Sequence, residues 1–172
     1  MNEDLLERAS WTWGLSLIAL TVAIHALGVV MMALVMEKIR VRLDNRSLGL
    51  RYVIPIVIGL VGAVGLLLAV LHGIEATIWA AAYLWLGALG SPIDAMLYSV
   101  DSMSTRGASG LTLQRHWQMM GALEAFDGML LFGISTAYIF AVMQVYWPML
   151  SRRAQRDQPA APPSRAPVAA LA

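Results

Sequence analysis

The residues best suited to chemistry in this chain form a short polar segment, residues 104–110, which reads Ser-Thr-Arg-Gly-Ala-Ser-Gly. Glycine adopts positive φ values at little cost, and this freedom lets successive backbone carbonyls point to one side of a loop. Rings of such carbonyls, contributed by several chains around one axis, replace the water shell of a cation. We therefore predict a filter-like loop for a cation, made of Ser104, Thr105, Arg106, Gly107, Ala108, Ser109 and Gly110.

Arg106 conflicts with this prediction, because guanidinium groups facing a narrow shared axis would repel cations. Like charges about 4 Å apart cost about 4 kcal/mol per pair even at an effective dielectric constant of about 20. Arg106 must therefore point away from the axis or be neutralised. Asp101 precedes it on a run with helical character, and we predict an ion pair between these two side chains behind the loop. The alternative is that each faces water at a loosened outer mouth.

Two acidic residues follow the loop. Glu124 and Asp127 lie about one turn apart on one face of a long apolar run. Two interpretations stay open. The carboxylates ring an outer vestibule, or they form salt bridges between elements, with Arg115 as a candidate partner.

The remaining ionisable residues inside apolar runs are two histidines and a glutamate. Such groups are functional candidates wherever they lie within a membrane. His25 lies in the middle of the first apolar run, and we expect a neutral histidine that hydrogen-bonds to a neighbouring helix, rather than a proton relay. His72 and Glu75 interrupt the second run, at a depth that predicts residues of the membrane interface.

The sequence contains no visible catalytic constellation. His, Asp and Glu are not spaced as metal ligands, and Ser-His-Asp, Walker, Rossmann and glycosidase patterns do not occur. Cysteine is absent, which excludes disulfides and Cys-ligated metals. We therefore expect no enzyme, no cofactor, no metal site and no nucleic-acid partner.

Residues 94–144 resemble the pore module of bacterial two-transmembrane potassium channels. In that family a pore helix leads into Thr-Thr-Val-Gly-Tyr-Gly-Asp and then into an inner helix. Here Leu97-Tyr98-Ser99 corresponds to the pore helix and residues 104–110 correspond to the filter. The inner helix supplies GALEA at 121–125 and FGISTA at 132–137. The resemblance covers about a third of the chain well and about half of it loosely.

The filter is degenerate by the standard of that family. Thr105 and Gly107 keep the family residues at their positions. The departures are Arg106 for Val, Ala108 for Tyr, Ser109 for the second Gly and Gly110 for Asp. The loss of the tyrosine removes the aromatic cuff that fixes the filter diameter, so we expect weaker selectivity.

The resemblance implies passive transport of a monovalent, potassium-like cation through a homotetramer in the bacterial inner membrane. It also implies that Tyr98 and Asp101 support the filter from the pore helix. The alternative is a non-conducting structural or regulatory membrane subunit that keeps the channel fold.

Composition and length place these residues in a membrane protein. The chain has 172 residues, of which 59% are hydrophobic and only 13% charged, against about 25% charged in soluble domains. We predict an all-α membrane protein with three transmembrane helices, a re-entrant pore helix and the filter-like loop, in contact with the lipid bilayer. Residues 1–36 form an N-terminal tail and the first span, and residues 37–51 form a basic loop. Residues 52–150 form the pore module, and residues 151–172 form a disordered tail.

Charge predicts the orientation. Short loops rich in Lys and Arg stay in the cytoplasm, so we place residues 37–51 and 151–172 inside and the N-terminus outside. Within the pore module we expect an outer helix from residue 52, a pore helix over 92–103 and an inner helix over 119–147. Ser91 and Pro92 mark the start of the pore helix. Gly128 and Gly133 are candidates for bending points or close packing in the inner helix. The sequence leaves open whether residues 73–89 extend the outer helix or lie at the interface.

Overall fold

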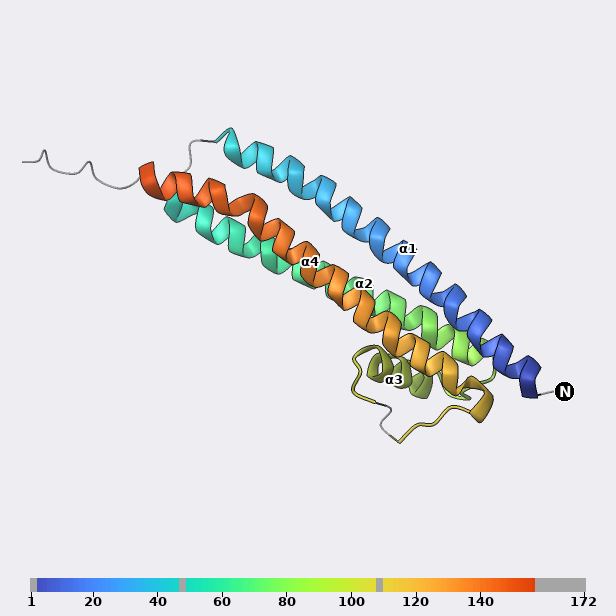
Figure 1. Ribbon diagram of the computed structural model, residues 1–172. Coiled ribbons are helices and arrows are strands. Elements are labelled where there is room, and N and C mark those ends of the chain that lie inside the picture. Colours follow the sequence, from blue (N-terminus) through green and yellow to red (C-terminus); the bar gives the residue numbers. More distant parts are fainter. Residues whose placement is uncertain (1–2, 47–48, 108–109, 157–172) are drawn as a thin grey trace, which may run out of the picture.

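The computed structural model of the chain is all-helical and describes residues 3–46, 49–107 and 110–156 (Figure 1). None of these residues lies in a β-strand. The elements in chain order are α1 (Glu3–Asp44), α2 (Leu50–Trp85), α3 (Pro92–Met103), the 3₁₀ turn η1 (Arg115–Trp117) and α4 (Gln118–Arg156). The predicted disordered tail falls on residues 151–172, and the part of it beyond 156 lies outside the described residues.

Within the described residues, three segments are long and apolar enough to cross a membrane: Arg8–Asp44, Leu50–Trp85 and Arg115–Arg156. Their outward surfaces carry large apolar side chains, such as Leu27, Ile58 and Phe132. Their interior holds polar and charged groups, and this inverted pattern suits a bundle surrounded by lipid. The buried polar residues of the described chain include Thr21, His25, Glu75, Ser99, Asp101, Glu124, Asp127 and Ser135. The predicted all-α fold is therefore confirmed, with three helices that are long and apolar enough to span a membrane.

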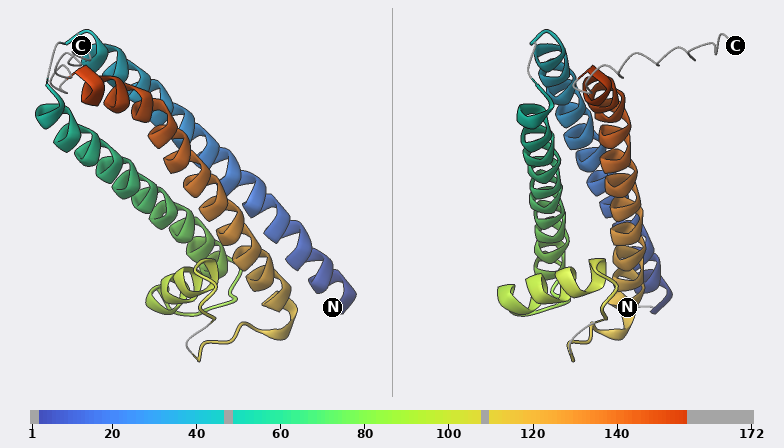
Figure 2. Two further views of the ribbon diagram at one scale, coloured as in Figure 1. Left: turned by 60° about the vertical axis from the view of Figure 1, so that its left-hand side comes forward. Right: turned by 90° about the vertical axis from the view of Figure 1, so that its left-hand side faces the viewer.

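The short helix α3 begins and ends at the predicted residues. The Ser91 side chain accepts a hydrogen bond from the backbone N–H of Asp94, and Pro92 occupies the first turn. A capping serine and a proline at the helix start satisfy or remove donors that the helix itself leaves without partners. α3 lies beside α2 and α4 at the end of the bundle that also holds the start of α1 (Figures 1 and 2).

The long helices extend further than predicted. α1 continues to Asp44, so most of the predicted basic loop is helical, and α4 runs through Pro148 to Arg156 rather than ending near Trp147. Lys, Arg and Glu are good helix formers, and Glu37 pairs with Arg40 at 2.7 Å along the α1 surface. α2 is one continuous helix from Leu50 to Trp85. Most of residues 73–89 therefore extends the outer helix, which settles the question left open by the sequence.

The two basic segments lie at the same end of the bundle. The Arg153 guanidinium of α4 donates hydrogen bonds to the carbonyls of Leu43 at 2.7 Å and Arg46 at 3.2 Å. The N-terminal start of α1 and the loop after α3 lie at the opposite end (Figure 2). The segments around Leu43–Arg46 and Arg153 can therefore face the same side of a membrane, whereas Arg106 and Arg115 lie toward the other end.

The helices pack through two apolar clusters with a polar layer between them. One cluster, near α3, includes Leu17, Trp79 and Tyr83, and the other, toward the basic end, includes Met36, Val64 and Tyr146. The polar layer is formed by residues of α1, α2 and α4 that come between the two clusters along each helix: His25, His72, Glu75 and Ser135. This layer is the most unusual feature of the bundle, because buried polar groups inside a membrane are costly unless they are paired.

Two glycines of α4 differ in their surroundings. A Cβ on Gly128 would meet the backbone of Met103 at the end of α3, whereas a Cβ on Gly133 has nothing within 4 Å. Gly128 is thus a close-packing position within one chain. α4 is continuous through both residues, so neither marks a break in the helix.

Candidate functional site

The filter-like loop begins directly after α3 and contains three described residues with positive φ. Thr105 has φ 57°, Gly107 has φ 84° and Gly110 has φ 80°. A left-handed conformation is ordinary for glycine but uncommon for threonine. The Ser104 hydroxyl donates to the Asp101 carbonyl at 3.2 Å, which holds the start of the loop against the helix end. Ala108 and Ser109, also predicted filter residues, lie outside the described residues.

Asp101 and Arg106 form the predicted ion pair. Arg106 Nη1 lies 3.2 Å from Asp101 Oδ1, and the Arg106 backbone N–H donates to the Asp101 carbonyl at 3.0 Å. The two side chains differ in burial, with 2% of the Asp101 side chain exposed and 69% of the Arg106 side chain. The carboxylate is therefore fixed in the protein, while the guanidinium stays in contact with the surroundings.

This exposure makes the pair a weak one. We expect Asp101→Ala and Arg106→Val to show a coupling free energy below about 1 kcal/mol in a double-mutant cycle, since solvent screens exposed ion pairs. Thermal or denaturant unfolding of the four proteins in detergent measures it. A coupling of several kcal/mol would contradict the exposed position of the guanidinium and indicate that Arg106 becomes buried on assembly.

Glu124 does not ring a vestibule, and it forms no salt bridge with the described residues. Its side chain is fully buried, the Tyr83 hydroxyl donates to Oε2 at 2.7 Å, and the Ser99 hydroxyl donates to Oε1. Both open interpretations are wrong because α2 and α3 cover this face of α4.

Tyr98, predicted to support the filter, packs edge-on against Tyr83 with ring centroids 5.3 Å apart. Burial raises the pKa of the Tyr98 hydroxyl, and the nearby Glu124 carboxylate adds to this effect.

Asp127 is also buried rather than facing a vestibule. Its Oδ2 accepts hydrogen bonds from the Thr21 hydroxyl at 2.7 Å and from the Trp79 indole N–H at 3.0 Å. Its Oδ1 accepts no hydrogen bond from the residues that the structure describes. Asp127 thus ties α4 to both α1 and α2 through its side chain.

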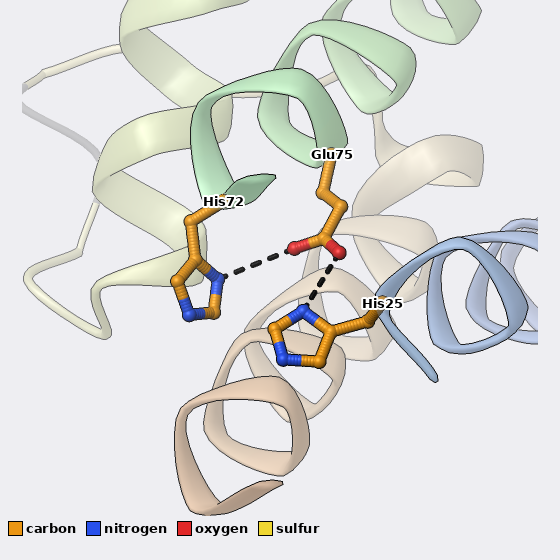
Figure 3. Close-up of side chains that lie close together, drawn as sticks. All are labelled: His25, His72 and Glu75. Carbon is orange, nitrogen blue, oxygen red and sulfur yellow. Dashed lines mark hydrogen bonds and ion pairs between the residues drawn. The ribbon is translucent and has the colours of Figure 1, made fainter. Parts of the chain in front are cut away.

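The polar layer next to Asp127 brings together three ionisable residues from two helices. Glu75 extends one carboxylate oxygen toward each histidine (Figure 3). His25 Nδ1 lies 2.8 Å from Glu75 Oε1, and His72 Nδ1 lies 3.3 Å from Glu75 Oε2. The far nitrogens of both rings, the Nε2 atoms, lie 3.1 Å from the Ser135 hydroxyl of α4. Glutamate, two imidazoles and a hydroxyl therefore close a ring of polar contacts.

The packed, hydrogen-bonded position predicted for His25 is confirmed, and Glu75 and His72 pack beside it. His25 is packed and hydrogen-bonded to two neighbouring helices, as expected. Glu75 is fully buried and His72 is partly buried, so both belong to the bundle interior, while their depth in a membrane stays a prediction. Because α2 continues to Trp85, residues 72–75 lie within this helix and pack against α1 and α4.

Helical spacing is the one signal that could have found this layer. His72, Glu75, Trp79 and Tyr83 recur every three or four residues, and such residues share one face of a helix. Spacing along one helix does not show which residues of another helix face it. Spacing along α2 therefore does not indicate that His25 of α1 completes the cluster. It also does not show that the three ionisable residues lie close enough together to share a ligand.

Comparison with protein-family models, curated proteins and solved structures finds no match to the chain. The resemblance to potassium-channel pore modules therefore stands on the motifs of residues 94–144 alone.

Proposed function

We propose that this protein is a pore-loop, channel-like membrane protein in which several copies meet around residues 104–110. The transported species would be a monovalent, potassium-like cation moving passively, with low selectivity. The observation that supports this best is the unit formed by α3 and its loop. A capped short helix at one end of a membrane bundle leads directly into a segment with positive φ at Thr105, Gly107 and Gly110.

The C-terminal end of α3 has one feature that favours a cation. The helix ends at Met103, and its carbonyl end carries a partial negative charge. Val100, Met103 and Ser104 line a cavity of about 350 Å³ together with Gly128 and Phe132 of α4. One chain supplies one such helix end and one arc of carbonyls, so a complete cation pathway requires symmetric assembly, for which we propose a tetramer.

Arg106 supports a second candidate function. Its exposed guanidinium lies on the same loop, so assembly would bring several positive charges toward one region. A non-conducting structural or regulatory subunit with the channel fold accommodates this charge without difficulty. Conduction distinguishes the two candidates.

Ion flux tests the proposed function. In liposomes with a potassium gradient, we expect flux above that of protein-free vesicles, and a higher flux for Arg106→Val because positive charge leaves the loop. Arg115→Val removes an exposed positive charge from η1 and serves as the matched control. Background flux for wild type and Arg106→Val alike would reject conduction and leave the non-conducting candidate.

Orientation gives an independent prediction. The chain contains no cysteine, so single cysteines introduced at the exposed residues Asn45 and Gln114 can be labelled without background. A membrane-impermeant reagent applied to spheroplasts should label position 114 and spare position 45, because the basic end faces the cytoplasm. The reverse pattern would invert the topology and place the loop on the cytoplasmic side.

A further inference from the structure

With both histidines neutral, the ring of His25, His72, Glu75 and Ser135 is one proton short of its four polar contacts. Neutral His25, neutral His72 and the Ser135 hydroxyl each bring one N–H or O–H. The three hydrogen bonds of the ring, His25 to Glu75 and each histidine to Ser135, use all three. The fourth contact, between His72 Nδ1 and Glu75 Oε2, is then left with lone pairs on both atoms at 3.3 Å.

Glu75 Oε2 reflects this shortage. It is fully buried, and among the described residues no group donates a hydrogen bond to it. A buried carboxylate with two neutral histidines has a net charge of −1, which is costly inside a membrane bundle. One positive charge between these groups would remove both the lone-pair conflict and the net charge.

We propose that His25, His72 and Glu75 bind a divalent transition metal ion of the zinc class. The candidate ligand atoms of the three residues all lie within 4.8 Å of one another. Tetrahedral zinc with bonds of 2.0–2.1 Å needs ligand atoms about 3.3 Å apart, so small side-chain movements complete the site. Two imidazoles and one carboxylate are a ligand set that suits such ions, and a fourth position is left for water. This proposal does not depend on the proposed transport function.

The surroundings of the ligands fit a metal better than a proton. A shared proton is held between two heavy atoms. Here three side chains converge, because both histidines direct the same nitrogen, Nδ1, at one carboxylate (Figure 3). With a metal on both Nδ1 atoms, each Nε2 carries the ring proton. Ser135 Oγ, 3.1 Å from both, has two lone pairs to accept them. Metal-bound histidines commonly donate their other N–H to an acceptor in this way.

His72 gives the site access to the surface. Its side chain is 28% exposed, while His25 and Glu75 are fully buried. Two cavities, of about 350 and 330 Å³, are both lined by His72, and the second is also lined by Ser135. The first cavity also borders Ser104 at the beginning of the loop, so His72 connects the cluster with that end of the bundle.

Cobalt binding to the purified full-length protein tests the proposal. The protein carries an affinity tag without histidines, is stripped with chelator, and is titrated with Co²⁺ in detergent. We expect saturable binding of about one ion per chain, with the visible absorption of low-symmetry Co²⁺, reversed by Zn²⁺. Glu75→Gln and His72→Ala should each weaken binding more than about 100-fold, and Ser135→Ala, which removes only the shared acceptor, about 10–100-fold.

His116 provides the matched control. It is the third of the chain's three histidines and lies in η1, outside the cluster, so His116→Ala should bind Co²⁺ like the wild type. A second readout guards against misfolded variants: Zn²⁺ should raise the Tm of wild type and His116→Ala, because it binds only the folded site, and leave the Tm of Glu75→Gln unchanged. Absence of saturable Co²⁺ binding by the wild type, or equal binding by His72→Ala, would overturn the metal site and leave a proton as the only positive charge of the ring.

Discussion

Replacing Gly128 by alanine is expected to destabilise the folded protein by about 1–3 kcal/mol, the range for overpacking a tight contact. The new Cβ would lie 2.6 Å from the Cα atom and 2.8 Å from the carbonyl carbon of Met103. Both are backbone atoms, so no side-chain rotation relieves the clash, and α3 must move away from α4. Unfolding in detergent, followed by the helical signal in circular dichroism, measures the loss.

Gly133→Ala is the matched control in the same helix. A Cβ there meets nothing within 4 Å, and alanine is favoured over glycine inside a helix by about 0.5–1 kcal/mol. Its stability should equal or exceed that of the wild type. Equal losses for the two variants would show that Gly128 matters for helix flexibility and not for its contact with α3.

Glu124→Leu is expected to cost about 1–3 kcal/mol, because it leaves the buried Tyr83 hydroxyl without its acceptor. The Ser99 hydroxyl keeps a partner after this change, because the Ala76 carbonyl lies 2.8 Å from it and can accept its one proton in place of Glu124. The loss should therefore come mainly from Tyr83. Unfolding of the purified variant in detergent gives the free energy.

Tyr83→Phe in the same background should recover much of the loss. Removing both partners of a buried hydrogen bond is far less costly than removing one. Additive losses for Glu124→Leu and Tyr83→Phe would contradict this pairing and would indicate that Glu124 interacts chiefly with another group.

Local signals were sufficient to predict α3. Ser91 and Pro92 fix its start, and the polar loop fixes its end, so both bounds agree with the structure. The bounds of α1 and α4 were less predictable. Hydropathy falls where the chain leaves the apolar region, but helical hydrogen bonding continues through charged residues, as it does from Glu37 to Asp44. Hydropathy reports the environment of a helix, and not where the helix ends.

The polar interior could be predicted only in part. An acidic residue near the end of an apolar run resembles an interface or vestibule residue in the sequence, and Glu75, Glu124 and Asp127 were interpreted in that way. Each proved to be buried against a hydrogen-bonding partner from another helix: His25, Tyr83 or Thr21. Partners that lie on different helices depend on how the helices are rotated about their axes. This rotation is set by packing across the whole bundle, which no single helix encodes.

Cross-linking between copies tests most directly whether residues 104–110 meet around a shared axis. In the cysteine-free background, Thr105→Cys places one thiol on the exposed loop. Val30→Cys is the control, because Val30 is exposed and its helix, α1, makes no contact with α3 among the described residues. Under mild oxidation in native membranes, Thr105→Cys should form disulfide-linked dimers and Val30→Cys should stay monomeric. Monomers alone for Thr105→Cys, or equal cross-linking at both positions, would contradict a shared pore loop.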